Sequence, residues 1–266
     1  MNTFRDTPEY STKFRVVYHV ALLNHWREVM REQLPLLLAN KNIAELHVTI
    51  GTDANTEEQE ATALLRDFVE RKDAVGSCCW YRTALHECEH KAMMLVDQLA
   101  RRDDMPVLYF HGKGVSYSPP VSSNESFRKY LNRLVAEADR WAEFLAQSDC
   151  DACGPLLFLD ETHGLQFFAG NFWMAKASYL RSLVLYEEFA SNPGAALTPW
   201  GRHLAEMAVN RMGRMRPHAI DGTSLTPATF NAHMTALTEP AVNLPGNKGA
   251  SFITLAVIVG ADDPEK

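Results

Sequence analysis

Two short stretches of this sequence combine residue types that can do chemistry, and the first is HECEH, from His86 to His90. It matches the H-E-x-x-H pattern of zinc peptidases, in which the histidines share a helix face and the glutamate reaches a metal-bound water. We expect a helix over residues 86–102, with both histidines on the partly exposed flank of its apolar stripe. A zinc-dependent hydrolase is one interpretation, and a surface helix with a polar flank is the other.

The second stretch is VLYFHGKGVS at residues 107–116, a buried strand that runs into His111, Gly112, Lys113 and Gly114. Glycines allow a ligand to approach the backbone closely and allow positive φ angles. Lys113 adds a cation where an anionic ligand such as a diphosphate would bind. The alternative is a glycine-containing turn with a solvated lysine, and both interpretations fit these residues.

A third cluster, FFAGNFWMAKASYL at residues 167–180, contains Gly170-Asn171 between aromatic side chains. Sugar sites commonly use aromatic faces against C–H groups and amides that bond hydroxyls. The alternative is a buried corner between a strand and a helix, with Phe172 in the core. Asn171 stands out in either case, because a buried amide needs hydrogen-bond partners.

The elements that must position these residues alternate along the first half of the chain. Strand patterns lie at residues 14–20, 44–51, 77–82 and 105–116, and helical patterns at 24–40, 56–71 and 86–102. Such alternation predicts a single α/β domain with a mostly parallel, Rossmann-type sheet flanked by helices. Ligands on these sheets bind beyond the carboxyl ends of the strands. Lys113 lies at such an end.

The second half is less regular. We expect one long helix over 124–149, a strand over 153–159, an extended segment that becomes helical after Asn171, helices at 198–212 and 226–238, and a last strand at 251–259. Pro35 should kink or end the helix at 24–40, and Thr56 should cap the next helix.

Composition narrows the class of protein. The chain has 266 residues, of which 46% are hydrophobic and 22% charged, and a net charge of −7 argues against a nucleic-acid-binding surface. The polar N-terminus has no apolar signal core, and the longest apolar run, 251–260, is too short to span a bilayer. Five cysteines do not suggest a disulfide framework. We therefore expect a cytoplasmic protein without stable membrane insertion.

At this point the sequence resembles a set of glycosyltransferase-like proteins that carry a strand ending YFHTKG, then F-x-GNFWWA, then a glutamate within a helix. This chain has YFHGKG at 109–114, FFAGNFWMAK at 167–176 and RHLAEMA at 202–208. Order and spacing agree from about residue 14 to residue 210. Gly112 replaces the usual threonine, and Met174 replaces the second tryptophan.

The resemblance implies a GT-A-like glycosyltransferase that moves a sugar from a nucleoside-diphosphate sugar to an acceptor hydroxyl. It implies a tail at 1–13, a nucleotide-sugar-binding half at 14–116, an acceptor and catalytic half at 117–219, and an extension at 220–266. Related enzymes place an Asp-x-Asp metal site at the end of the fourth strand, where this chain has His111-Gly112-Lys113. Lys113 would then stabilise the diphosphate without a metal. A divalent ion such as Mn²⁺ would not be required.

The resemblance also assigns the remaining site residues. The donor-binding set is Tyr18, His19, Asn24, His111, Gly112 and Gly114. The catalytic set is Glu206 as general base, Lys113 and Asn171. The acceptor set is Glu87, Asp160, Glu161, Gly170 and Trp173. The acceptor could be a glycan, a lipid-linked sugar, a protein or a modified nucleobase. A non-catalytic sugar- or nucleotide-binding module is the further alternative.

Overall fold

The first half of the chain folds as alternating strands and helices. The computed structural model describes residues 10–70, 77–120, 122–160, 165–191, 205, 208–210, 215–220 and 224–226. In chain order the elements are β1 (Phe14–Ala21), α1 (Trp26–Leu37), β2 (Ile43–Gly51), α2 (Asn55–Glu70), β3 (Ser77–Thr83), the 3₁₀ turn η1 (Leu85–Glu87), α3 (His90–Ala100) and β4 (Val107–His111). The pairs β1–β2, β2–β3 and β1–β4 are all parallel.

Short strands from the second half extend this sheet to seven strands in the order β3-β2-β1-β4-β8-β5-β9. They are β5 (Ala152–Gly154), β8 (Trp173–Ala175) and β9 (Pro217–Ala219). β8 runs antiparallel to both β4 and β5, whereas β5 and β9 are parallel. The prediction of a mixed, mostly parallel α/β sheet flanked by helices is confirmed. One continuous sheet joins strands from both halves of the chain, as expected for one domain.

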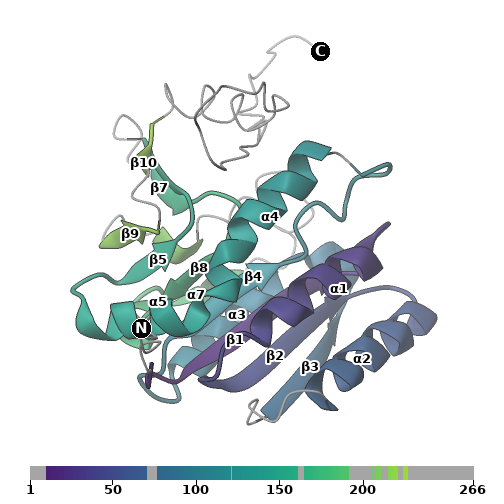
Figure 1. Ribbon diagram of the computed structural model, residues 1–266, viewed down its shortest axis with the longest axis horizontal. Helices are drawn as coiled ribbons and strands as arrows, with labels where there is room; N and C mark the ends of the chain where they lie inside the picture. The colour runs from purple at the N-terminus through teal and green to yellow at the C-terminus, as the bar shows by residue number, and fades with distance from the viewer. Residues whose placement is uncertain are drawn as a thin grey trace, which may run out of the picture.

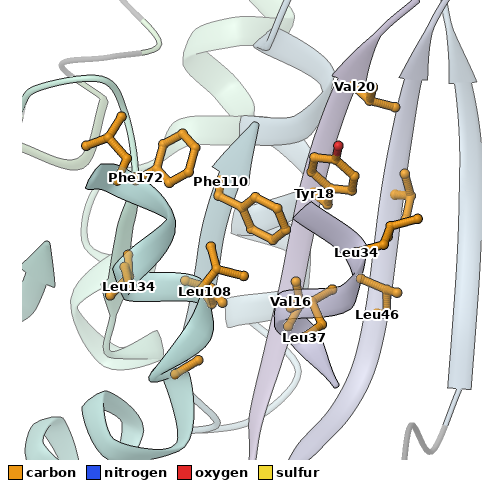
Figure 2. Packing of buried hydrophobic residues seen from close by; sticks show 14 of the residues in the cluster. Val16, Tyr18, Val20, Leu34, Leu37, Leu46, Leu108, Phe110, Leu134 and Phe172 are labelled. Atoms are coloured by element: carbon orange, nitrogen blue, oxygen red, sulfur yellow. The ribbon is translucent and has the colours of Figure 1, made fainter. Parts of the chain in front are cut away.

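Alternate residues of the central strands point to opposite faces of the sheet. Tyr18 and Phe110 pack on the side of α1 and α4 (Ser122–Ala136), where Figure 2 shows them among aliphatic side chains. Val17 and Tyr109 pack on the other side, against α3 and α7 (Leu185–Ser191). In Figure 1, α1 and α4 lie in front of the sheet and α3 and α7 behind it. Burial of these apolar side chains on both faces stabilises the sheet.

The segment from 153 to 183 differs from the prediction. Instead of one strand over 153–159, β5 belongs to the large sheet and β6 (Leu157–Asp160) to a second sheet of order β10-β6-β7. There β6 pairs with β7 (Leu165–Phe168) and β10 (Ser224–Leu225). Helix resumes only at α6 (Ala177–Arg181), six residues later than Asn171. The chain changes sheets here, so a single strand pattern covered two elements.

Two helix predictions also need correction. The long helix at 124–149 is two helices, α4 and α5 (Ala138–Gln147), because the Asn40 amide accepts the Asp139 N–H at 2.9 Å and donates to the Val135 carbonyl at 2.8 Å, in place of the helical bond between them. Thr56 lies inside α2, and α1 ends at Leu37, two residues after Pro35.

The predicted elements at 198–212 and 226–238 lie almost wholly outside the described residues, apart from a 3₁₀ turn η3 (Ala208–Asn210), and the strand at 251–259 lies entirely outside them. Within the described ranges, no helix has the length and hydropathy required to cross a membrane.

Candidate functional site

The site lies where the direction of the sheet's connections reverses. From β1 the chain moves outward to β2 and β3 with α1 and α2 on one face, then returns through α3 on the other face to β4. β1 and β4 are neighbours, and their register pairs His19 with His111 at the carboxyl ends. Ligands of open α/β sheets bind in the crevice at such a switch point. The structure therefore brings these two predicted residues together.

His19 is buried at this edge, with Nδ1 2.9 Å from Thr49 Oγ1. Burial lowers the pKa of its imidazole to about 4, so the ring is neutral at pH 7. The Thr83 hydroxyl is also buried, and it has no hydrogen-bond partner among the described residues. A Cβ on Gly51 would lie 3.5 Å from His19 Cε1 and 3.6 Å from this hydroxyl, so the three residues face one another.

Two other residues that were predicted to bind the donor are Tyr18 and Asn24, and their side chains make other contacts. Tyr18 is fully buried, its ring stacks on Phe110 at 4.5 Å, and its hydroxyl donates to Gln33 Oε1 at 2.9 Å. The prediction that Tyr18 contacts the donor is wrong, because its side chain lies in the core. Asn24 is exposed and donates from Nδ2 to the Val115 carbonyl at 2.8 Å, which joins the loops that follow β1 and β4.

The HECEH stretch does not form one helix. It comprises part of η1, a left-handed residue at Cys88 (φ 47°) and the first residue of α3 at His90. His86 is exposed, whereas His90 is buried against the Phe189 ring at 4.7 Å. The alternative of a zinc hydrolase on this helix is wrong, because the two histidines do not share a face. No group of three or more His, Cys, Asp or Glu side chains in the described ranges could hold a metal ion.

Glu89, from the same stretch, is the site residue that the sequence analysis missed. The break at Cys88 places it directly before α3, and its Oε2 accepts hydrogen bonds from Tyr109 Oη and Asn171 Nδ2, both at 2.6 Å. Its Oε1 lies 3.6 Å from His111 Nδ1. We call Glu89, Tyr109, His111 and Asn171 the Glu89 cluster. The rule that ligands bind beyond strand ends could have found Glu89, because it follows β3 at the same edge.

His111 completes this cluster with a defined tautomer. Its Nε2 lies 2.9 Å from the Gly170 carbonyl, which can only accept, so Nε2 carries a proton. Nδ1 therefore faces Glu89 with its lone pair when the ring is neutral. The side chains of His111 and Glu89 are 12% and 17% exposed, so the pair is in contact with solvent.

The GNFW segment, residues 170–173, holds the Glu89 cluster in place through hydrogen bonds from buried side chains. Asn171 is fully buried, and its Oδ1 accepts the indole N–H of Trp173 at 2.8 Å, so both ends of the amide are engaged. Trp173 is also fully buried, against Tyr109 at 5.3 Å. The predicted direct contacts of Asn171 and Trp173 with a sugar are therefore wrong. Gly170 has φ +84°, and a Cβ there would lie 2.5 Å from Leu131 Cδ1.

The loop after β4 carries the predicted diphosphate site. Gly112 has an ordinary φ, and its N–H donates to the His19 carbonyl at 2.9 Å, whereas Gly114 has φ +90°. The Lys113 ammonium lies 6.0 Å from the centre of the Phe127 ring, on the α4 side of the sheet. The Phe127 ring also lies next to Gly170, whose carbonyl holds His111, because a Cβ on Gly170 would be 2.9 Å from Phe127 Cε1.

A second polar cluster lies beneath this loop. Arg128 forms a bidentate pair with Glu32, at 3.2 and 2.7 Å, and donates to the Lys113 carbonyl at 3.1 Å. Asn132 donates to Glu32 at 2.8 Å and accepts from Gln33, which also donates to the His111 carbonyl at 3.1 Å. We call Glu32, Gln33, Arg128 and Asn132 the Arg128 cluster. It fixes the backbone from which His111 and Lys113 project.

The remaining predicted residues are not brought into the cluster. The Glu87 carboxylate accepts the Ala84 N–H at 2.9 Å and lies 3.3 Å from Lys91 Nζ, so it closes its own turn. Asp160 ends β6, but its side chain lies outside the described residues, as do Glu161 and Glu206. Their predicted roles stay predictions.

Comparison with protein families identifies one match. Residues 18–221 match a domain of unknown function, DUF8361. The chain belongs to this family. No curated protein matches the sequence.

The DUF8361 chain was also compared with solved structures. It is similar to the mannosyltransferase PcManGT from Pyrobaculum calidifontis in complex with GDP-Man and Mn²⁺, at 12% identity and a TM-score of 0.44, over 85% of this chain and 60% of that one. It is similar to the glycosyltransferase GlyE of Streptococcus pneumoniae TIGR4, at 13% identity and a TM-score of 0.39, over 84% and 47% of the chains. A third is 4-diphosphocytidyl-2C-methyl-D-erythritol synthase, at 9% identity and a TM-score of 0.35, over 76% and 100%. The chain thus spans less than two thirds of the first two proteins.

Three kinds of polar group meet at the carboxyl edge of the DUF8361 sheet. Lys113 supplies a cation in the loop after β4, and His111 with Glu89 supplies an imidazole and a carboxylate at the end of β4. The Thr83 hydroxyl and the His19 ring lie deeper, at the ends of β3 and β1. Such an edge can bind an anion and transfer a proton within one site.

Proposed function

We propose that this protein is a glycosyltransferase that moves a sugar from a nucleoside-diphosphate sugar to an acceptor hydroxyl. One observation carries the proposal: the YFHGKG and GNFW segments, which are 56 residues or more apart in the sequence, meet around Glu89 at the switch point of the sheet. These are the segments that resemble glycosyltransferases. Their contact argues that they form one site.

In this proposal, Lys113 neutralises the diphosphate as the bond between sugar and phosphate breaks. The loop geometry supports this role, because Gly114 adopts a positive φ and Arg128 holds the Lys113 carbonyl. The ammonium is then directed from a fixed backbone. No divalent ion is required for the diphosphate, and Glu206 stays a candidate for the acceptor side.

The unsatisfied Thr83 hydroxyl supports a polar ligand deeper in the crevice. A buried hydroxyl without a partner costs about 1–3 kcal/mol, and a hydroxyl or carbonyl of the nucleoside would remove that cost. His19 and Gly51 border the same space. The nucleoside would therefore lie towards β1 and β3, with its diphosphate towards Lys113.

A nucleotide-binding panel tests the proposal. UDP, GDP, CDP and dTDP are each added to the purified protein in EDTA, and one of them should stabilise it by about 2.7 kcal/mol at a hundredfold excess over Kd. The matching nucleotide sugar should then be hydrolysed slowly with water as acceptor. If no diphosphate raises the melting temperature, the proposal fails. Binding without turnover would favour the non-catalytic module.

The Lys113→Ala variant tests the metal-free site. It should weaken diphosphate binding by about tenfold or more, because a charge-assisted phosphate contact is lost, and Lys113→Arg should retain most of the affinity. Lys129→Ala, an exposed lysine on α4, is the matched control and should bind as the wild type does. If EDTA abolishes binding and Mn²⁺ restores it, the metal-free part of the proposal is wrong.

A further inference from the structure

The pair formed by His111 and Glu89 has the geometry of a proton-accepting site. The two side chains come from the end of β4 and the start of α3, and both are in contact with solvent. Their facing atoms, Nδ1 and Oε1, are 3.6 Å apart. That distance is too long for a direct hydrogen bond of normal length, which is about 2.7–3.2 Å. A hydroxyl can donate its single proton to Nδ1 at about 2.8 Å, and the carboxylate is close enough to stabilise the imidazolium that forms.

The hydrogen bonds around the pair define which atom accepts the proton. The Gly170 carbonyl holds the proton of His111 on Nε2, so Nδ1 has the lone pair. Glu89 Oε2 already accepts from Tyr109 and Asn171, and these donors favour the charged carboxylate. A proton taken by Nδ1 produces an imidazolium next to this carboxylate, which stabilises it.

We propose that His111 is the general base of the transfer reaction and that Glu89 positions and stabilises it. This inference rests on the proposed glycosyltransferase function. The proton of the acceptor hydroxyl moves to His111 Nδ1, and the oxygen forms a bond to the anomeric carbon. The bond from that carbon to the diphosphate oxygen breaks, and its electron pair stays on the nucleoside diphosphate. The Lys113 ammonium stabilises the negative charge of this leaving group. Solvent then removes the proton from the imidazole.

The proposed step also predicts the stereochemical outcome. The acceptor oxygen bonds to the anomeric carbon as the diphosphate leaves the opposite face of that carbon. A single displacement of this kind inverts the anomeric configuration. The proposed reaction therefore belongs to the inverting class.

The test uses the nucleotide sugar found by the binding panel, with water as the acceptor. His111→Gln should lower the hydrolysis rate by about 10²–10⁴-fold, while diphosphate affinity stays within about twofold of the wild type. Glu89→Gln should give a smaller loss, again without a change in affinity. Glu137→Gln, an exposed glutamate that pairs with Arg140, is the control and should leave the rate unchanged.

The pH profile separates a base from a structural residue. The wild-type rate should fall at acidic pH, and this acidic limb should be absent in His111→Gln. The charged or titratable groups facing His111 are Glu89, Tyr109 and His19, with Lys113 two residues later. His19, with its pKa lowered to about 4, does not titrate in the range that matters.

The outcomes of these experiments either support or contradict the role of His111 as the general base. If His111→Gln keeps the rate and the acidic limb, or loses affinity in proportion to rate, His111 is not the base. If the first product detected by ¹H NMR retains the anomeric configuration of the donor, the single displacement is wrong. If His111→Gln does not fold, Glu89→Gln decides, because an unchanged hydrolysis rate in that variant would contradict the role of the cluster. A wild-type protein that binds nucleotide but releases no sugar overturns this inference and leaves nucleotide binding intact. Failure to bind any diphosphate overturns both proposals.

Discussion

The two polar clusters at the end of β4 each contain a glutamate and an asparagine but differ in how the carboxylate is paired. In the Arg128 cluster, a nearly buried guanidinium is held by both oxygens of Glu32, and Asn132 and Gln33 use their remaining donors on neighbouring acceptors. In the Glu89 cluster, one carboxylate oxygen accepts two short hydrogen bonds and the other faces an imidazole at a longer distance.

This difference separates a structural role from a chemical one. In the Arg128 cluster both oxygens of Glu32 are held by the guanidinium, which also fixes the backbone through the Lys113 carbonyl. In the Glu89 cluster the His111 Nδ1 atom lies 3.6 Å from Glu89 Oε1, and both side chains are partly exposed. Mutations in the Arg128 cluster should therefore change stability, and mutations in the Glu89 cluster should change the rate.

The largest effect is expected for Arg128→Ala. Removing the buried guanidinium takes a cation from the partly exposed Glu32 and a donor from the Lys113 carbonyl, and it should lower the free energy of unfolding by about 3–5 kcal/mol. Denaturant unfolding measures this loss. Arg140→Ala removes an exposed partner of Glu137 and should cost under about 1 kcal/mol. Equal losses in the two variants would contradict the structural role given to the Arg128 cluster.

A smaller loss of stability is expected for Gly170→Ala. This residue lies between the two clusters. Its φ of +84° disfavours any side chain, and a Cβ would lie 2.5 Å from Leu131 Cδ1 and 2.9 Å from Phe127 Cε1. The cost should be about 2–4 kcal/mol, and the carbonyl that holds His111 should move. Gly112→Ala is the matched control, because its new Cβ meets atoms only at 3.5 Å or more. A Gly170→Ala protein as stable as Gly112→Ala would show that this turn tolerates a side chain.

The smallest change in stability is expected to come from His19. This residue lies opposite His111 in the register of β1 and β4, but its side chain is buried. Its pKa is lowered from 6.5 to about 4 by burial, so the unfolded chain binds a proton between these values and the folded chain does not. Stability should therefore fall as pH decreases, by about 2 kcal/mol between pH 7 and pH 5. Unfolding of the wild type and of His19→Gln across this range measures the difference. An unchanged pH slope in the variant would mean that another group is responsible.

The parallel half of the fold could be predicted because its strands are rich in β-branched and aromatic residues and its helices are amphipathic. The second half could not, because its strands are only three or four residues long and lie in two sheets. The break between α4 and α5 was hidden because its cause, the bonding of the Asn40 amide to Val135 and Asp139, joins distant segments.

The candidate site was predicted in part. His111 and Lys113 were predicted from their place at the end of a strand and the GNFW segment by resemblance, and the structure brings His111 and Asn171 together at Glu89, whereas the role of Lys113 stays a prediction. Asn171 and Trp173 were given direct contacts with a sugar, but burial shows that they support Glu89 instead. Glu89 was missed because HECEH matched a helical metal pattern, and a positive φ at Cys88 cannot be deduced from a non-glycine residue.

The reversed direction of β8 has a consequence for how the site is assembled. Because β8 runs antiparallel to β4, the residues that precede it arrive at the edge where β4 ends. The amide that holds Glu89 therefore comes from a segment synthesised some sixty residues after the tyrosine that holds the same carboxylate. A nascent chain can complete its four parallel strands before this amide exists, so competence for chemistry would be acquired only when the late strand docks.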